Sequence, residues 1–180
     1  MNMINQSHIK FFEEKLKIDV SNVKVNDIRL EKSAIGEFNT YDEINIDIDK
    51  IKRVYKRATT LFVLTTVVHE LVHLCQFQYN KSAILPINNL FTANILYERY
   101  ESNEWHDKPL EIDAMIMEVY YVYSTFGVND SIRGFTRIRC SRVGISTLIK
   151  YASRLNDRRF TRLVASSFDS QFINLIKRRA

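Results

Sequence analysis

The chain has 180 residues, enough for one domain with a sizeable core, and a net charge of +5. Its hydrophobic fraction of 46%, with only 4 Gly and 2 Pro, excludes a collagen-like repeat and a chain made largely of flexible linkers. Two cysteines, Cys75 and Cys140, are too few for a disulfide framework, so we expect a reducing, cytoplasmic location.

The positive charge is concentrated toward the C-terminal end. Residues 131–180 contain ten Arg and two Lys against two Asp, a net charge of +10, whereas residues 1–130 carry 14 cations against 19 carboxylates, a net charge of −5. A segment this basic suits a polyanion such as nucleic acid, or an acidic protein surface. The alternative is a solvated helical face whose arginines pair with the acidic part of the chain.

Neither a secretory signal nor a membrane span is expected. Residues 1–17 mix polar and charged side chains and lack the apolar run of a signal peptide. The longest apolar stretch, residues 61–68, is too short to cross a bilayer and predicts a buried core helix instead. We therefore expect no membrane partner.

The first third of the chain changes from helical to alternating periodicity. An amphipathic helix is predicted over residues 7–17, where apolar side chains recur on one side. After it, apolar and polar residues alternate as in half-buried strands, with Gly36 as a candidate bulge. In the last strand, Asp47 and Asp49 are expected on a solvated face. The three predicted strands are residues 23–30, 34–40 and 44–49.

The rest of the chain predicts mostly helices. Apolar residues recur at helical spacing from residue 51 to about residue 79. Pro109 suits the first position of another long helix, from residue 110 to about residue 126. We therefore assign the chain to the α+β class, with a small antiparallel sheet packed on one helix and a mostly helical C-terminal part. Further predictions are a loop at 80–89, a helix at 90–100, an irregular stretch at 101–109, a turn at 127–134 and two or three short helices within 145–179.

Two histidines stand four residues apart in the sequence His69-Glu70-Leu71-Val72-His73. On a helix this spacing places both imidazoles on one face, one turn apart, where they can bind the same metal ion. Glu70 lies between them and can reach a metal-bound water without being a ligand. Zinc lowers the pKa of such a water to roughly 7, and the carboxylate takes its proton as the water attacks a carbonyl.

The neighbours of this motif are uncharged, which predicts that its helix is buried. Two histidines are costly to desolvate without a partner, and a metal ion is a natural one. The alternative is a pair of core histidines satisfied by hydrogen bonds. Cys75 is expected to be an ordinary core residue. The uncharged neighbours are Val67, Val68, Leu71, Val72, Leu74 and Cys75.

A catalytic zinc ion needs a third protein ligand and an open position. His8 belongs to a separate predicted helix and His106 to an irregular segment, so neither is favoured. Glu111 falls in the first turn of the helix that follows Pro109 and is the favoured ligand, with Asp113 as the alternative. A second helix that delivers a carboxylate to the two-histidine helix makes a His₂Glu site.

The motif of His69, Glu70 and His73, followed by Glu111, resembles the gluzincin type of the zincin metallopeptidases. The similarity is greatest to the small forms encoded by bacteria and phages, and it covers residues 41–126. It implies zinc ligands at His69, His73 and Glu111, with Glu70 as the general base. It also implies a three- to four-stranded sheet packed on the motif helix and a second helix that carries the glutamate.

One position departs from the gluzincin pattern. Gluzincins often place an aspartate four residues after the glutamate ligand, where it is a hydrogen-bond partner for a histidine, whereas this chain has Met115 there. We expect Asp113 or Gln76 to orient a histidine instead. We further divide the chain into a zincin-like catalytic domain, residues 1–130, and a basic helical extension, residues 131–180, packed on the same domain.

A hydrolase also needs a group that stabilises the developing oxyanion. Several tyrosines, an arginine and a histidine are available for this role, and the sequence does not select among them. The candidates are Tyr97, Arg99, Tyr100, Tyr120, Tyr121, Tyr123 and His106.

The expected function is a zinc-dependent metallopeptidase that hydrolyses a peptide bond in a protein or peptide substrate. Its expected location is the cytoplasm. If the gene is of phage origin, the protein is expected in the host-cell cytoplasm or in the virion. One alternative is a non-catalytic binding or virion-assembly protein with a structural or vestigial metal site and a basic C-terminal surface for a polyanion. Another is a toxin-like or immunity-related protease that cuts one cognate partner and leaves general peptides intact.

Overall fold

The structure is a computed structural model that describes residues 4–31, 34–39, 42–54, 59–85, 109–127 and 145–166. Within these ranges the chain combines a small sheet with a larger number of helices, which confirms the α+β class. The elements are α1 (Gln6–Leu16), β1 (Lys24–Asp27), β2 (Gly36–Asn39), β3 (Glu43–Ile46), α2 (Ile48–Val54), α3 (Thr59–Phe77), α5 (Pro109–Phe126), α7 (Ile145–Ser153) and a further helical stretch at residues 158–166.

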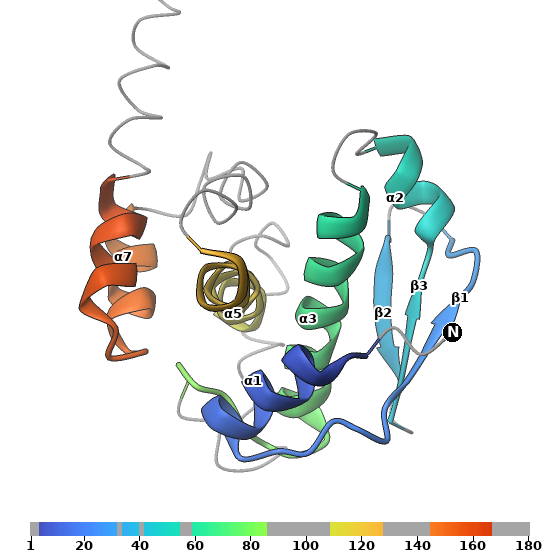
Figure 1. Cartoon of the computed structure of the whole chain (residues 1–180), viewed down its shortest axis with the longest axis horizontal. Coiled ribbons are helices and arrows are strands. Elements are labelled where there is room, and N and C mark those ends of the chain that lie inside the picture. The colour runs from blue at the N-terminus through green and yellow to red at the C-terminus, as the bar shows by residue number, and fades with distance from the viewer. Residues whose placement is uncertain are drawn as a thin grey trace, which may run out of the picture.

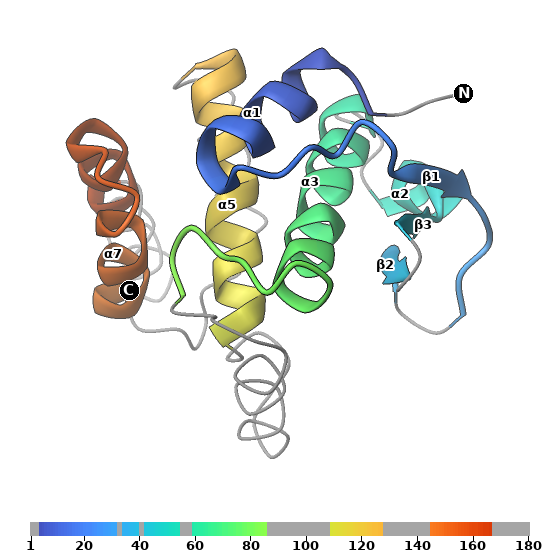
Figure 2. The same cartoon turned by 90° about the horizontal axis from the view of Figure 1, so that it is seen from below.

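The sheet and the helices are stacked in layers (Figure 1). The sheet packs against one side of α3, and α5 packs against the opposite side. α7 covers the side of α5 that faces away from α3. Figure 2 shows α1 lying across α3 and α5. The interface between α3 and α5 is therefore enclosed on several sides.

The sheet has the strand order β1–β3–β2 and is mixed, so the expected antiparallel sheet is wrong. β2 pairs with β3 in antiparallel register, with Phe38 opposite Ile44, whereas β1 pairs with β3 in parallel register, with Val25 opposite Ile44. β3 lies between the two strands that precede it in the sequence. Alternation along a strand specifies which side chains share a face, but it does not specify which strands are neighbours.

Asp47 and Lys50 hold the connection between β1 and β2 over the end of β3. The Asp47 carboxylate accepts hydrogen bonds from the Leu30 amide (3.1 Å) and from the Lys50 amide (2.7 Å). The Lys50 ammonium donates to the carbonyls of Leu30 (3.1 Å) and Ala34 (2.8 Å). Asp47 is consequently buried, so the solvated position expected for it is wrong, while Asp49 is exposed as expected.

The same aspartate explains why the third strand is shorter than predicted. Because Asp47 accepts the amide hydrogen of Lys50, it acts as the N-cap of α2, which begins at Ile48 where a strand was expected. The helix predicted from residue 51 onward corresponds to α2 and α3, with residues 55–58 outside the described part. α5 begins at Pro109 and ends at Phe126, which confirms the predicted helix.

α3 is an apolar core helix. Residues Thr60–Phe77 have the length and hydropathy to cross a membrane, but 72% of this stretch is buried within the protein. The side chains of Val67, Leu71 and Leu74 are fully buried, and Cys75 is a core residue as expected. Burial of this degree is what a central helix of a layered fold produces.

Several predictions lie outside the described residues: the helix at 90–100, most of the irregular stretch at 101–109, most of the turn at 127–134, Cys140 and much of the basic segment 131–180. Within that segment α7 packs on α5, and Phe160 contacts Tyr120 of α5 with ring centroids 4.8 Å apart. The division at residue 130 stays a prediction.

Candidate metal centre

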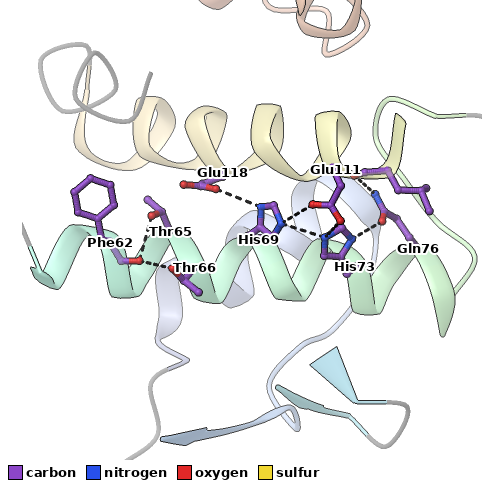
Figure 3. Close-up of polar contacts among 9 residues, drawn as sticks. Phe62, Thr65, Thr66, His69, His73, Gln76, Glu111 and Glu118 are labelled. Atoms are coloured by element: carbon purple, nitrogen blue, oxygen red, sulfur yellow. Dashed lines mark hydrogen bonds and ion pairs between the residues drawn. The ribbon is translucent and has the colours of Figure 1, made fainter. Parts of the chain in front are cut away.

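His69 and His73 lie on the side of α3 that faces α5 (Figure 3). The helical repeat places them one turn apart, and their rings meet edge to face with centroids 4.7 Å apart. Glu111 reaches them from the first turn of α5, immediately after Pro109 begins that helix. Two helices packed side by side thus bring together the three residues that the sequence indicated as metal ligands.

The donor atoms of these residues converge on one point. His69 Nε2 lies 3.1 Å from His73 Nε2 and 3.2 Å from Glu111 Oε2, and His73 Nε2 lies 3.3 Å from Glu111 Oε1. In a tetrahedral zinc site with bonds of about 2.0 Å, neighbouring ligand atoms are roughly 3.3 Å apart. The spacing and the chemistry of the donors therefore fit a zinc ion.

The side chains of the three candidate ligands are almost completely shielded from solvent. His69 is 8% exposed, His73 is 6% exposed and Glu111 is 6% exposed. Ring nitrogens and a carboxylate that face one another away from water are unfavourable unless positive charge lies between them. The cluster therefore needs either protons or a metal cation at its centre.

In the metal-free protein, protons supply this charge. Burial opposes the protonation of His69, but its contacts with Glu111 and Glu118 outweigh burial and raise its pKa to about 10. Burial of Glu111 is likewise outweighed by hydrogen bonds from His69 and His73, which lower its pKa to about 2. Burial opposes the protonation of His73 as well, but its hydrogen bond to Glu111 together with the charges of Glu111 and Glu70 outweighs burial and raises the pKa. A metal ion that binds here must displace these protons.

Glu118, a residue that the sequence reasoning missed, holds the other side of the His69 ring. Its Oε2 lies 3.4 Å from His69 Nδ1, and the residue is 5% exposed. A carboxylate at Nδ1 keeps the proton there and leaves the lone pair on Nε2, as is usual for metal-binding histidines. The signal was present in the sequence, because Glu118 follows Glu111 by about two helical turns and so shares its face.

Asp113, the alternative third ligand, lies outside the donor cluster. Its Oδ2 accepts hydrogen bonds from Gln76 Nε2 (2.7 Å) and Ser82 Oγ (2.5 Å). Gln76 in turn faces His73, with Oε1 2.9 Å from Nδ1. Both residues expected to orient a histidine in place of Met115 are thus connected to His73, and Gln76 contacts it directly. Burial raises the pKa of Asp113 to about 6.

Glu70 lies on the side of α3 that faces β2. A Cβ atom added to Gly36 would come within 2.6 Å of Glu70 Oε1 and 2.8 Å of Thr66 Cγ2, so the glycine leaves room for this carboxylate. Glu70 is 7% exposed, and none of the hydrogen bonds among the described residues involves its carboxylate. Burial raises its pKa, an effect that the nearby His69 and His73 oppose. Glu70 is therefore a buried carboxylate for whose lone pairs no group in the described part of the chain competes.

β2 is the outer strand of the described sheet on the side of these residues. Gly36 keeps a regular register with β3, so the bulge expected there is not formed. Phe38, two residues further on, has its ring 6.0 Å from that of His73 and stacks on Phe77 at 5.2 Å. β2 therefore runs along α3 from Glu70 to His73.

The other predicted site residues lie away from the cluster or outside the described part. Tyr121 stacks on His8 of α1 at 5.0 Å, while Tyr120 and Tyr123 contact Phe160. His8 is accordingly a core residue rather than a ligand, and the contacts of these three tyrosines are with α1, with residues 157–166 and within α5 itself. Tyr97, Arg99, Tyr100 and His106 are outside the described residues.

Comparison with known proteins gives no family for this chain. No protein-family model, no curated protein and no solved structure matches it. The resemblance to the gluzincins therefore stays a prediction from the motif residues, and the structure shows a cluster of His69, His73 and Glu111 that could hold a metal ion.

Proposed function

We propose that this protein is a zinc-dependent metallopeptidase of the gluzincin type, with His69, His73 and Glu111 as zinc ligands and Glu70 as the general base. The observation that carries the proposal is the convergence of two Nε2 atoms and a carboxylate, 3.1 to 3.3 Å apart, together with the buried carboxylate of Glu70, which has no hydrogen-bond partner among the described residues and whose pKa the two histidines lower. The first feature suits a metal ion, and the second suits a base.

In this proposal, different residues of the chain have different roles in hydrolysis. When bound, zinc supplies Lewis acidity, which lowers the pKa of a water to roughly 7 and polarises a carbonyl. Glu70 takes the proton of the attacking water and passes it to the leaving amine. Glu118 and Gln76 hold the two imidazoles from their Nδ1 sides, so that both Nε2 atoms face the centre.

The position of β2 supports a peptide as the substrate. A strand at the edge of a sheet offers backbone donors and acceptors to which an extended peptide can add as a further strand. β2 lies against Glu70 through Gly36 and against His73 through Phe38. A peptide paired with β2 would therefore run alongside the cluster.

The test combines zinc content with peptide hydrolysis. The purified wild-type protein is expected to carry about one zinc per chain and to cut an unbiased peptide library, with the products identified by mass spectrometry. Glu70→Gln keeps the shape of the side chain but removes the base, so it should retain zinc and lose hydrolysis by roughly 10²–10⁴-fold. An active Glu70→Gln protein, or a wild-type protein that binds no zinc after reconstitution, would overturn the proposal.

Gly36 provides a second test, specific to the position of Glu70. In Gly36→Ala the new methyl group lies 2.6 Å from Glu70 Oε1, so we expect the carboxylate to move and hydrolysis to fall while zinc is retained. Gly127→Ala is the control, because Gly127 has a φ of 90° and nothing within 4 Å of an added Cβ, so its cost is backbone strain alone. Equal activity of the two variants would contradict the role of Glu70.

The charge of the described C-terminal helices favours a second function, binding of a polyanion such as nucleic acid. Lys150, Arg158, Arg159 and Arg162 are exposed, and the ion pairs found among the described residues include none of them. For these four cations, the expected pairing with acidic residues is therefore not seen within the described part.

Salt dependence tests this second function. Affinity for duplex DNA should fall steeply with rising salt, and the slope of log K against log salt should shrink by about 0.9 for each phosphate contact removed by a charge-neutralising substitution. Zinc-site variants such as Glu70→Gln should bind DNA as the wild type does. Absence of binding at low salt would remove this function.

A further inference from the structure

We infer that Gln76 and Asp113 form a positioning relay that presents the Nε2 lone pair of His73 to the bound metal ion. The inference rests on the metal site of the proposed function, and it assigns a role to two polar residues that are not ligands themselves. Both side chains are fully buried, with 0% exposed, so their polar groups depend on protein partners.

The orientation of the Gln76 amide follows from its neighbours. One end of the amide lies 3.2 Å from the Leu110 carbonyl oxygen and 2.7 Å from Asp113 Oδ2. A carbonyl oxygen can only accept, so the group that faces it must be the NH₂ group. The amide oxygen of Gln76 consequently points the other way, toward His73.

That oxygen decides which nitrogen of His73 carries the proton. Gln76 Oε1 lies 2.9 Å from His73 Nδ1, and because an amide oxygen cannot donate, Nδ1 must be the N–H. Once metal binding has displaced the second proton, an imidazole that keeps its proton on Nδ1 has its lone pair on Nε2. This is the atom that lies 3.3 Å from Glu111 Oε1. One backbone carbonyl and one amide thus select the donor atom of the metal site.

Ser82 fixes the far end of the relay. Its Oγ accepts hydrogen bonds from the amides of Ile84 (3.0 Å) and Leu85 (2.8 Å), which directs its own proton to Asp113 Oδ2 at 2.5 Å. The second oxygen of Asp113 is buried with no hydrogen-bond partner among the described residues. An unsatisfied buried carboxylate oxygen is unfavourable for folding, which indicates that Asp113 contributes more than stability.

The relay acts on one histidine only. The Nδ1 atom of His69 is held by the Glu118 carboxylate, whereas the Nδ1 atom of His73 is held by a neutral amide that is itself held by Asp113. Removal of the relay should therefore weaken metal binding through His73 and leave the contact of His69 in place.

A pair of glutamine variants tests the relay with Zn²⁺ as the probe. Gln76→Met keeps the length of the side chain and removes the amide. Gln78→Met is the control, because Gln78 immediately follows α3 and donates to a carboxylate, that of Asp42 at 2.6 Å, from an exposed position without contacting a histidine. In competition with a chromophoric chelator, Gln76→Met should bind zinc about 10- to 100-fold more weakly, and Gln78→Met should bind like the wild type.

An exchange of groups separates a relay from a merely structural contact. Gln76→Glu alone places two carboxylates against each other, so zinc binding should weaken. The double variant Gln76→Glu/Asp113→Asn keeps an acceptor for His73 Nδ1 and restores a donor–acceptor pair between positions 76 and 113. It should therefore bind zinc more tightly than Gln76→Glu, and thermal unfolding of the metal-free variants checks that each is folded.

The ring nitrogens of His73 give a direct spectroscopic readout. In the zinc-bound protein, ¹⁵N NMR should show His73 protonated at Nδ1 and metal-bound at Nε2. Zinc binding that needs Glu111 but is equal in Gln76→Met and Gln78→Met would overturn the relay and leave the metal site standing. A wild-type protein that binds no zinc would overturn both.

Discussion

The first half of α5, residues 109–118, and the second half, residues 119–126, carry opposite chemistry. The first half is buried throughout, whereas the second is buried only as far as Val122. In the first half, the carboxylates of Glu111, Asp113 and Glu118 approach α3 and make polar contacts with His69, His73 and Gln76. In the second half, Tyr120 and Tyr121 make aromatic contacts with α1 and with Phe160. One helix thus joins a polar cluster that suits a metal ion to an aromatic core.

Because of this difference, substitutions at the two ends of one helix should affect different properties of the protein. A buried carboxylate is unfavourable unless it is paired, so the first half gains from partners and from a bound cation. A buried aromatic pair contributes about 0.5–1.5 kcal/mol beyond the burial of its area. We therefore expect substitutions in the first half to act on metal affinity, and substitutions around the second half to act on the free energy of unfolding.

The largest effect is expected from Glu111→Gln. The variant replaces a charged ligand with a neutral amide, so zinc affinity should fall by more than the roughly 10- to 100-fold that loss of an outer partner causes. Elemental analysis and chelator competition measure this. Glu13→Gln, at an exposed position of α1, is the control and should bind zinc normally. Unchanged affinity in Glu111→Gln would remove Glu111 from the site.

Phe160→Ala should have the opposite profile. Phe160 is fully buried against the rings of Tyr120 and Tyr123, with centroids 4.8 and 5.3 Å away. Its truncation should lower the free energy of unfolding by about 3–5 kcal/mol, measured by urea denaturation of the metal-free protein. Zinc affinity of the folded protein should not change. A loss of affinity would show that the two halves of α5 are coupled.

We also expect the free energy of unfolding to depend on pH through His8, which stacks on Tyr121 in the second half of α5. Burial lowers the pKa of His8 from 6.5 to about 4, and a contact with the Leu64 backbone opposes only part of this effect. Between these values the unfolded chain binds a proton that the folded protein does not. Stability is therefore lost as the pH falls from about 6.5 to about 4, by on the order of 3 kcal/mol.

His8→Gln isolates this contribution. Glutamine can keep the hydrogen bond that His8 accepts from the Asn5 amide, but it does not titrate. Urea denaturation at several pH values should show the wild type losing stability relative to His8→Gln as the pH falls below about 6.5. If the difference in free energy of unfolding between the two proteins does not change with pH, His8 is not a neutral, buried residue of the folded protein.

The smallest effect is expected from Glu118→Gln. The substitution removes the charge next to His69 Nδ1 while keeping an acceptor, so zinc affinity should fall by about 10-fold, the lower end of the range for outer partners. Tyr120→Phe is the control from the second half: it loses the hydrogen bond from Lys15 at 3.0 Å and touches neither histidine. Equal zinc affinities would show that Glu118 does not position His69.

The parts of the site that were predictable are those within a single helix. His69 and His73 share a face because the helical repeat is a property of the backbone, and Pro109 begins α5 because its fixed φ and missing N–H suit that position. Both Glu111 and Asp113 approach α3, and the packing of the two helices places Glu111 at the histidines and Asp113 at Gln76. Glu118 shares the helical phase of Glu111 and was missed, although the helical repeat would have found it.

The sequence by itself determined the α+β class, the two long helices and the candidate donor set, because these depend on local periodicity and on residue chemistry. Only the tertiary structure decided that the sheet is mixed, that Gly36 lies against Glu70 and that His73 meets the amide of Gln76 held by Asp113. Contacts of this kind depend on strand order and on how α3, α5 and β2 pack together. Elements far apart in the chain set that packing, and no local pattern encodes it.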